Sequence, residues 1–412
     1  MSGALATLKE RGFFKQCTDE EKLATLLDTE RVTFYAGFDP TGPSLHVGHL
    51  VPLFAMAHLN RAGHRAIALA GGGTARIGDP SGKTEMRKML TVDQIRSNTE
   101  SIKKQMAKFI DFGSGNSLLL DNADWLADLN YIEFLRDIGR HFSVNRMLSF
   151  ETYKMRLETG LSFIEFNYQL LQSYDFLELY RKHGCKLQIG GDDQWGNIVA
   201  GADLIRRVEG AEVVGLTFPL VTRADGKKMG KTEKGALFLD PDMVAPYEFY
   251  QYWRNVPDQD VEKFLFLYTF LPAEEVRDLG SLQGQEINRS KEVLAYEMTR
   301  IVHGGEEAAK AREAAKAAFS VAPGGAQAAD GIPSLTISRS ELDKGIGVLE
   351  LFARTALCKS NSEAKRLVTQ GGARINDEKV TDPLMVVDSS RLEEGEMLLR
   401  AGKKRYFRIV AD

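Results

Sequence analysis

The sequence predicts an α/β fold: a Rossmann-like, doubly wound parallel sheet, followed by a helical region and a small C-terminal α+β domain. The first of two strand–helix–strand patterns begins with RVTFYAGFDP (31–40), an apolar strand that ends at a Gly/Pro turn. A helix follows from about Leu45 to Arg61, stops at Gly63, and leads into the strand HRAIALAGGG (64–73). Such a unit forms a parallel strand pair with a right-handed crossover.

A second pattern of the same kind follows later in the chain. A helix is expected over 163–182 with Gly184 as its stop, then the strand CKLQIGG (185–191), then a helix after Gln194. In doubly wound sheets, ligands bind beyond the carboxyl ends of the strands. The segments expected at that edge are Tyr35–Thr41, Gly71–Asp79 and Gly190–Gln194.

The remaining sequence predicts the domain organisation. From about Ala245 to Phe319 the pattern is mostly helical and closes with EEAAKAREAAKAAF, a strong helix former. The Gly-, Ala- and Pro-rich stretch 320–334 cannot bury much surface, which favours a flexible linker. We therefore expect a Rossmann-like catalytic domain over 1–222, a lysine loop and helical domain over 223–319, a linker over 320–345 and a C-terminal domain over 346–412.

Composition excludes several classes of protein. Of the 412 residues 43% are hydrophobic and 27% charged, and no apolar run reaches the roughly 18 residues of a membrane span. The N-terminal segment lacks the features of a secretion signal or presequence, so we expect a cytoplasmic protein. Cys17, Cys185 and Cys358 are too few and too far apart for a disulfide scaffold or a thiolate metal site. The net charge of −4 does not exclude a polyanionic partner, because basic residues can cluster.

The motif His46-Val-Gly-His49 places two histidines on one face of a helix's first turn. Gly48, between them, lets a ligand approach the backbone. Free backbone N–H groups and the positive end of the helix dipole favour an anion there, and the imidazoles add donors for a phosphate. Alone the tetrapeptide is a weak signal, because ordinary helix starts also contain histidine.

A lysine-rich segment stands later in the chain. Lys227-Lys228-Met229-Gly230-Lys231-Thr232 follows the turn signal RADG and precedes an apolar segment, which predicts an exposed loop. A solvated run of charges is the usual explanation of such a loop. Here it follows the histidine motif in the order found in class I aminoacyl-tRNA synthetases, whose HIGH and KMSKS signatures the two segments resemble.

Three polar residues share one stripe of the helix expected over 163–182. Tyr168, Gln172 and Asp175 are spaced i, i+4 and i+7 on a helix otherwise filled with Phe, Leu and Tyr. On an arbitrary helix such a stripe more often faces water than a ligand. With the two motifs present, a polar-ended pocket explains it better.

Four longer segments make the resemblance closer. YAGFDPTGPSLHVGHL, the glycine-rich stretch ending IGDPSGK, FNYQLLQSYDF and QIGGDDQWGN together resemble the bacterial tyrosyl-tRNA synthetases over nearly the whole chain. The resemblance implies activation of L-tyrosine with ATP to tyrosyl-adenylate, release of pyrophosphate, and transfer of tyrosine to the 3′ end of tRNA(Tyr). It also implies a homodimer, and Mg²⁺ that arrives with ATP rather than a metal bound by the protein.

The resemblance assigns the site residues by position. Those implied for tyrosine are Tyr35, Asp79, Tyr168, Gln172, Asp175 and Gln194. Those implied for ATP or the adenylate are Asp39, Thr41, Gly48, Gly191, Asp193 and Thr232. The reaction needs no protein nucleophile, because the tyrosine carboxylate attacks the α-phosphorus itself. Catalysis through charge stabilisation on the phosphates is expected from His46, His49, Lys228 and Lys231, with Lys83 and Arg87 as further candidates for pyrophosphate.

The C-terminal segment resembles a second known domain. VLELFARTALCKSNSEAKRLVTQGGARINDEKV, from about Val348, is similar to the small RNA-binding domain shared with a small-subunit ribosomal protein and with pseudouridine synthases. Basic residues suited to phosphate contact cluster there: Lys359, Lys365, Arg366 and Arg374. A generic solvated face is the alternative. We expect this domain to bind tRNA.

Two positions depart from the family pattern. Gly230 stands where the class signature has serine, a variation familiar in this family. Asp192 stands where relatives commonly carry a small residue, so the resemblance leaves the electrostatics of the ATP pocket open there.

Three other functions fit parts of the pattern. A tryptophanyl-tRNA synthetase is the nearest, although Asp175 with Tyr35 suits a phenol better than an indole N–H. An RNA-binding protein on an inactive synthetase scaffold would not need intact histidine and lysine motifs. Another nucleotidyltransferase would join a different small carboxylate to AMP. Tyrosine-dependent exchange of pyrophosphate into ATP separates these possibilities.

Lys231→Ala should slow adenylate formation by about a hundredfold, because the loop is expected to act on phosphate charge in the transition state. The dissociation constant of tyrosine should change little. Pre-steady-state rates of adenylate formation, measured over a range of tyrosine concentrations, give both values. Equal losses in rate and in tyrosine affinity would contradict the assigned role.

Overall fold

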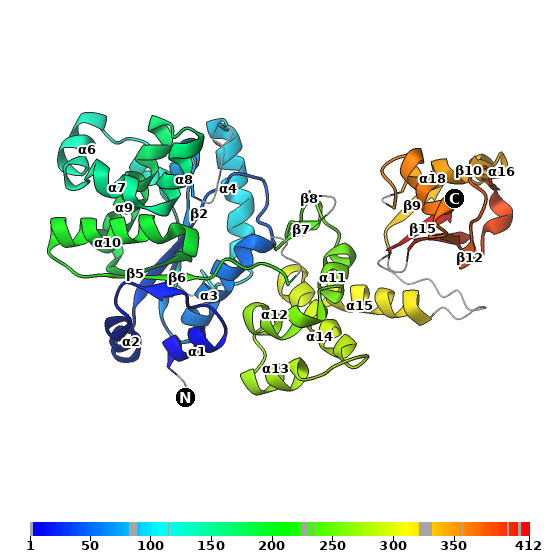
Figure 1. Ribbon diagram of the computed structural model, residues 1–412, viewed down its shortest axis with the longest axis horizontal. Helices are drawn as coiled ribbons and strands as arrows, with labels where there is room; N and C mark the ends of the chain where they lie inside the picture. Colours follow the sequence, from blue (N-terminus) through cyan, green and yellow to red (C-terminus); the bar gives the residue numbers. More distant parts are fainter. Residues whose placement is uncertain are drawn as a thin grey trace. The chain divides into compact units, whose positions relative to one another are not determined.

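The computed structural model describes residues 3–81, 89–113, 115–224, 229–232, 235–320, 332–355, 357–393, 395–402 and 405–412 (Figure 1), with the backbone alone at 231, 232 and 318–320. The chain folds as two compact units. The first comprises residues 1–244 and 256–294, and the second residues 245–255 and 295–412. The region predicted as one helical domain, 223–319, is therefore divided between the two units.

A six-stranded sheet forms the centre of the first unit. Its strand order is β1-β6-β5-β2-β3-β4, and each neighbouring pair is parallel except β1 with β6. The predicted α/β fold with a parallel sheet is confirmed. The strands are β1 (Gln16–Cys17), β2 (Thr33–Phe38), β3 (Arg65–Ala70), β4 (Leu118–Asp121), β5 (Cys185–Gly191) and β6 (Val214–Phe218).

The helices of this unit include those that the sequence predicts. The helix expected from about Leu45 begins as a 3₁₀ turn, Val47–His49, and continues as α3, Leu50–Arg61. The helix expected over 163–182 is α9, Phe163–His183, and the one expected after Gln194 is α10, Trp195–Glu209. Further helices are α1 (Ala4–Glu10), α2 (Glu20–Thr29), α4 (Val92–Met106), α5 (Ala123–Leu126), α6 (Tyr131–Asp137), α7 (Val144–Ser149), α8 (Glu151–Thr159), α12 (Val261–Tyr268) and α13 (Ala273–Gly280).

Side chains of the central strand β2 alternate between the two faces of the sheet. Tyr35 lies opposite Ile67 of β3 and Gln188 of β5 in the strand register. Its ring centroid is 5.3 Å from that of Phe176 in α9. Helices α9 and α10 cover this face, and α3 packs on the opposite one (Figure 1). The face with Tyr35 is thus the one that α9 closes.

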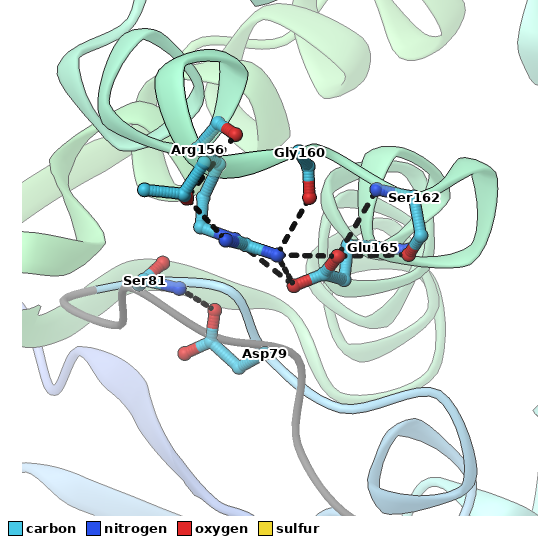
Figure 2. Close-up of polar contacts among 7 residues, drawn as sticks. Asp79, Ser81, Arg156, Gly160, Ser162 and Glu165 are labelled. Carbon is cyan, nitrogen blue, oxygen red and sulfur yellow. Dashed lines mark hydrogen bonds and ion pairs between the residues drawn. The ribbon is translucent and has the colours of Figure 1, made fainter.

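Helix α9 has well-defined ends. Ser162 Oγ accepts a hydrogen bond from the Glu165 N–H, and the Glu165 carboxylate accepts one from the Ser162 N–H at 3.1 Å. At the other end Gly184 has φ 62, a left-handed conformation that suits glycine. Arg156 of α8 donates to Glu165 at 2.9 Å and to the Gly160 carbonyl oxygen at 2.9 Å (Figure 2). This buried ion pair ties α8 to the start of α9.

Helices also begin the second unit. α11 (Pro246–Arg254) packs against α15 (Gly305–Ser320), and α14 (Ile287–His303) runs from the first unit into the second. Within the described part of the chain, none of the helices combines the length and the apolar character that crossing a membrane requires.

A small α+β domain with its own core ends the chain. Its main sheet has the order β12-β11-β14-β15-β9, in which β9 is parallel to β15 and the other pairs are antiparallel. Leu351, Leu399 and Ile409 are among its core residues. The elements are β9 (Ser334–Ile337), α16 (Arg339–Asp343), β10 (Ile346–Gly347), α17 (Val348–Ala353), α18 (Asn361–Thr369), β11 (Ala373–Ile375), β12 (Glu378–Lys379), β13 (Val386–Val387), β14 (Glu396–Ala401) and β15 (Arg405–Ala411).

The linker predicted over 320–345 overlaps this domain. β9 pairs with β15, with Ile337 opposite Ala411, and both Ile337 and Leu342 are buried in the domain's core. The domain therefore includes residues well before 346. Sequence reasoning missed β9 because it begins at Ser334, inside the Gly/Pro-rich stretch, and its four residues are too few for their alternation to stand out.

Arg156→Met should lower the free energy of unfolding by about 3–5 kcal/mol, because it leaves the Glu165 carboxylate buried without its cation. Both side chains are only 2% exposed. Burial raises the pKa of Glu165, but hydrogen bonds from Arg156 and Ser162 outweigh it and hold that pKa below its ordinary value. The stabilisation is therefore present at neutral pH and lost as pH falls through the lowered pKa.

Urea denaturation at neutral pH measures this loss. Arg136→Ala is the control, because Arg136 pairs with Asp137 on the surface and such pairs contribute little. It should leave stability unchanged. Equal stabilities for the Arg156 and Arg136 variants would contradict the structural role of the buried pair.

Candidate active site

A cavity opens at the carboxyl ends of β2, β3 and β5, the edge where parallel sheets bind ligands. It encloses about 1220 Å³, part of it open to solvent. All three segments expected at this edge contribute to its lining. The predicted site residues that line it are Tyr35, Asp39, Thr41, Gly48, His49, Asp79, Tyr168, Gln172, Asp175, Gly191, Asp193 and Gln194.

Asp175 is a buried carboxyl group held by two donors. Asn122 Nδ2 donates to its Oδ2 at 2.9 Å, and Trp125 Nε1 donates to its Oδ1 at 2.8 Å. Burial raises the pKa of Asp175 to about 8, while the bonds from Asn122 and Trp125 favour the charged form and act against that rise. A carboxyl group with this pKa can either donate to or accept from a ligand hydroxyl near neutral pH.

Tyr35 and Gln188 place two further polar atoms at the same wall. Among the described residues, Tyr35 Oη and Gln188 Oε1 are buried without a hydrogen-bond partner. Burial raises the pKa of the Tyr35 phenol well above its ordinary value, and the Asp175 carboxylate adds to the rise. A buried polar atom without a partner costs about 1–3 kcal/mol. Such atoms at a cavity wall are well placed to bond a polar ligand.

Asp39 joins α9 to the ends of β2 and β3. Tyr168 Oη donates to Asp39 Oδ2 at 2.9 Å, and Thr74 Oγ1 donates to Asp39 Oδ1 at 2.7 Å. Tyr168 and Asp175 are 5% and 2% exposed. The polar stripe of α9 therefore does not face water at these two positions, and it faces the cavity.

Asp79 and three amide side chains form a second polar network in the cavity. Gln194 Nε2 donates to Asp79 Oδ2 at 2.8 Å. The Ser81 N–H donates to Asp79 Oδ1 at 2.9 Å, as Figure 2 shows. Asn197 Nδ2 donates to the side-chain oxygens of Gln172 and Gln194, each at 3.1 Å. This network connects α9 and α10 with the 3₁₀ turn Asp192–Gln194, which follows β5.

The two histidines of the motif stabilise the turn before α3. His46 Nδ1 accepts from the Gly48 N–H at 3.0 Å, and His49 Nδ1 accepts from the His46 N–H at 3.1 Å. Each neutral imidazole therefore has its proton on Nε2, where it can donate to an anion. A Cβ at Gly48 would lie 2.7 Å from the His46 ring, so any other residue here would displace that ring. His49 lines the cavity, and His46 is not among the lining residues.

The chain beyond the lysine loop pairs with the histidine motif. The Val47 N–H donates to the Leu237 carbonyl oxygen at 3.0 Å, and the Leu239 N–H donates to that of Leu45 at 2.9 Å. Gly230 has φ 76, and a Cβ there would lie 3.1 Å from Val47 Cβ. Glycine therefore suits position 230 better than serine. The structure therefore places Gly230 of the lysine-rich segment beside the histidine motif.

Several predicted residues are not placed by the structure. Lys83, Arg87 and Lys228 lie outside the described residues. The backbone of Lys231 and Thr232 forms β7, which pairs with β8 (Gly235–Ala236). In the parts of the chain that are described, no group of three or more His, Cys, Asp or Glu side chains could hold a metal ion.

The predicted RNA-binding residues lie on the C-terminal domain. The exposed ones are Lys359, Lys365 and Arg366. Arg374 is half-buried and donates to the Asp377 carbonyl oxygen at 2.6 Å. In the sheet register Arg374 lies opposite Lys379 on one side and Arg400 on the other. These three basic residues form a row across the sheet.

Sequence reasoning missed three residues that line the cavity, Thr74, Asn122 and Gln188. It also missed Trp125 and Asn197, which donate hydrogen bonds to lining side chains. A signal for Asn122 and Trp125 was present. LLLD (118–121) is an apolar strand followed directly by Asn122, as polar residues follow the other strands, and Trp125 comes three residues later. The strand register shows that Gln188 shares a face with Tyr35.

Family comparisons agree with this geometry. Residues 27–320 match the family described as tRNA synthetases class I (W and Y). Residues 325–409 match the family described as the tyrosine–tRNA ligase SYY-like C-terminal domain. Together with the parallel sheet and the histidine motif at its edge, these matches define the class as that of the class I tRNA synthetases.

Individual relatives narrow this class to one amino-acid specificity among the proteins that the chain resembles. The tyrosine–tRNA ligase of Treponema denticola is 58% identical over 411 residues and covers 100% of both chains. That of Acetivibrio thermocellus is 55% identical over 409 residues and covers 99% of both. A C-terminally truncated mitochondrial tyrosyl-tRNA synthetase from Aspergillus nidulans matches with TM-score 0.68 and 32% identity, over 76% of this chain and 93% of that one. The chain belongs to the tyrosine–tRNA ligase family.

Asp175→Asn should change how stability depends on pH. Since burial raises the pKa of Asp175 from 3.8 to about 8, the folded state retains a proton that the unfolded state loses, and stability falls as pH rises through this interval. Asparagine does not titrate. The free energy of unfolding of the variant minus that of the parent should therefore increase with pH, by at most about 6 kcal/mol over the whole interval.

Urea denaturation of both proteins at about pH 5 and about pH 8.5 gives this difference. Asparagine loses one of the two hydrogen bonds, so the variant should be the less stable protein at the lower pH. A difference that stays constant with pH would contradict the raised pKa.

Proposed function

We propose that this protein activates L-tyrosine with ATP to tyrosyl-adenylate, releasing pyrophosphate, and then transfers tyrosine to the 3′ end of tRNA(Tyr). One observation carries the proposal. Tyr35 and Asp175, polar groups suited to a phenol, line the same cavity as His49, Gly191 and Asp193 at the ends of the parallel strands. A single cavity can therefore hold an amino acid and a nucleotide side by side.

The amino-acid end suits tyrosine. Asp175 and Tyr35 can bond the phenol hydroxyl, which would supply a partner for the Tyr35 oxygen. Tyr168, Gln172 and Asp79 can bind the ammonium group, with Gln194 beside them on Asp79. Phenylalanine would leave Asp175 and Tyr35 without that partner, and such unpaired buried groups disfavour its binding.

The nucleotide end suits ATP. Gly48 and Gly191 have no side chains to block close approach of a ligand to the backbone. Asp39, Thr41 and Asp193 line the cavity beside them. We assign these residues to ATP, together with Thr232 of the lysine loop.

Activation needs alignment and charge stabilisation. A carboxylate oxygen of tyrosine forms a bond to the α-phosphorus of ATP, and the bond from that phosphorus to the bridging oxygen breaks as pyrophosphate leaves with the electron pair. His46 and His49 are assigned to donate to the phosphates in the transition state. Lys228 and Lys231, with Lys83 and Arg87, are assigned to the pyrophosphate. Mg²⁺ would enter as part of the ATP substrate.

The C-terminal domain is proposed to bind tRNA. Exposed lysine and arginine side chains around α18, and the basic row through Arg374, suit contact with a phosphate backbone. A location in the cytoplasm accompanies this function, since charged tRNA is used there by ribosomes.

A homodimer is part of the proposal. Large apolar side chains on α6, α7, α8 and the start of α9 are exposed, and exposed apolar surface of this kind is suited to association with another protein. They are Tyr131, Ile132, Val144, Met155, Leu157, Phe163 and Ile164. A second copy would cover them through a two-fold interface. Molar mass in solution tests this assembly.

The exchange of labelled pyrophosphate into ATP tests the proposed function directly. Exchange should require tyrosine, and Tyr35→Phe should raise the KM for tyrosine by about tenfold or more because one hydroxyl partner is lost. Tryptophan-dependent exchange would favour a tryptophanyl enzyme instead. Exchange with another acid would favour a different nucleotidyltransferase, and no exchange would favour an RNA-binding protein.

Deleting residues 332–412 should leave tyrosine-dependent exchange within about twofold of the parent while reducing tRNA charging by about a hundredfold or more. The domain has its own core, so its removal need not disturb the cavity. Charging assays with tRNA(Tyr) measure the second effect. Loss of exchange as well would contradict this division of labour.

A further inference from the structure

Asp192 faces away from the cavity that the residues around it line. Gly191, Asp193 and Gln194 are lining residues, and Asp192 is not. Its Oδ1 accepts hydrogen bonds from Gln16 Nε2 at 2.8 Å and from Thr217 Oγ1 at 3.0 Å. The carboxylate is thus directed to the β1 edge of the sheet.

Gln16 and Thr217 are cross-strand neighbours. They lie directly opposite each other in the antiparallel pair of β1 and β6, so their side chains share one face. Thr217 is also opposite Gly190 in the parallel pair of β6 and β5. Its side chain is buried, with 0% exposed. Two strands other than β5 therefore donate to one carboxylate oxygen beside the end of β5.

The two hydrogen bonds to that oxygen fix the first residue of the 3₁₀ turn Asp192–Gln194. At the other end of the turn, Gln194 reaches into the cavity and donates to Asp79 at 2.8 Å. Asp193 stands between these two anchors. Burial raises its pKa, and the negative charge of Asp79 adds to the rise. The hydrogen bonds at Asp192 and at Gln194 therefore fix the turn on both sides of the residue that carries this carboxyl group.

We propose that Asp192, together with Gln16, is a positioning residue for ATP, an inference that rests on the proposed function. It touches no substrate and fixes the turn that presents Gly191 and Asp193 to the nucleotide. Both donors bond the same oxygen, so the role requires an acceptor rather than a charge. Asparagine supplies that acceptor and alanine does not.

Pyrophosphate exchange with Asp192→Ala and Asp192→Asn tests the proposal. The alanine variant should raise the KM for ATP by about tenfold, since two hydrogen bonds to a charged acceptor are lost. The KM of the alanine variant for tyrosine should stay within about twofold of the parent value. The asparagine variant should keep the KM for each substrate within about threefold of the parent value. Glu212→Ala is the matched control. It also removes a carboxylate that bonds the N-terminal segment, but its ion pair with Lys22 lies on the exposed surface.

Two near-isosteric variants keep the test independent of a folding defect. Gln16→Met and Thr217→Val each remove one donor while preserving most of the side-chain volume, and each should raise the KM for ATP by a smaller factor. The double variant with Gln16→Met and Asp192→Ala should have the same KM for ATP as Asp192→Ala alone, because both substitutions remove the same hydrogen bond.

Four results would overturn the proposal: an unchanged KM for ATP in Asp192→Ala, equal rises for both substrates, an asparagine variant as impaired as the alanine variant, or the same rise in Glu212→Ala. A parent protein without tyrosine-dependent exchange would instead overturn the proposed function. The two failures are therefore distinguishable in one assay.

Discussion

Parallel pairing of β2 with β3 on one side and with β5 on the other is the constraint on which the site depends. Because parallel strands end at the same edge, three segments that are far apart in the chain must meet there. The register that sets Tyr35 opposite both Ile67 and Gln188 also directs Tyr35 to the face that α9 covers. The polar stripe of α9 then completes the wall of the cavity.

The electrostatic cost of this arrangement is considerable. Among the described residues, the carboxyl groups that line the cavity are those of Asp39, Asp79, Asp175 and Asp193. Burial and like charges raise the pKa of such groups, as they do for Asp175 and Asp193. Side-chain donors offset part of the cost at Asp39, Asp79 and Asp175. The ammonium group of an amino acid would offset more, which is consistent with the proposed substrate.

The sequence alone predicted the parallel sheet, because two strand–helix–strand patterns have clear periodicity, and it predicted the stripe through Tyr168 and Asp175 from helical spacing. The roles of individual residues came from resemblance. Periodicity could not reveal Asn122 and Trp125 as partners of Asp175, because those contacts are tertiary. It also could not reveal that Asp192 faces β1, since a strand of two residues has no period. Gly230 became understandable only from its positive φ beside Val47.

The most direct test of the account is a crystal structure of the protein with a non-hydrolysable analogue of tyrosyl-adenylate. The account predicts the phenol oxygen within hydrogen-bonding distance of Tyr35 and Asp175, and the phosphate mimic beside His49 and the Gly191 backbone. An analogue bound with its phenol away from Asp175, or outside this cavity, would contradict it.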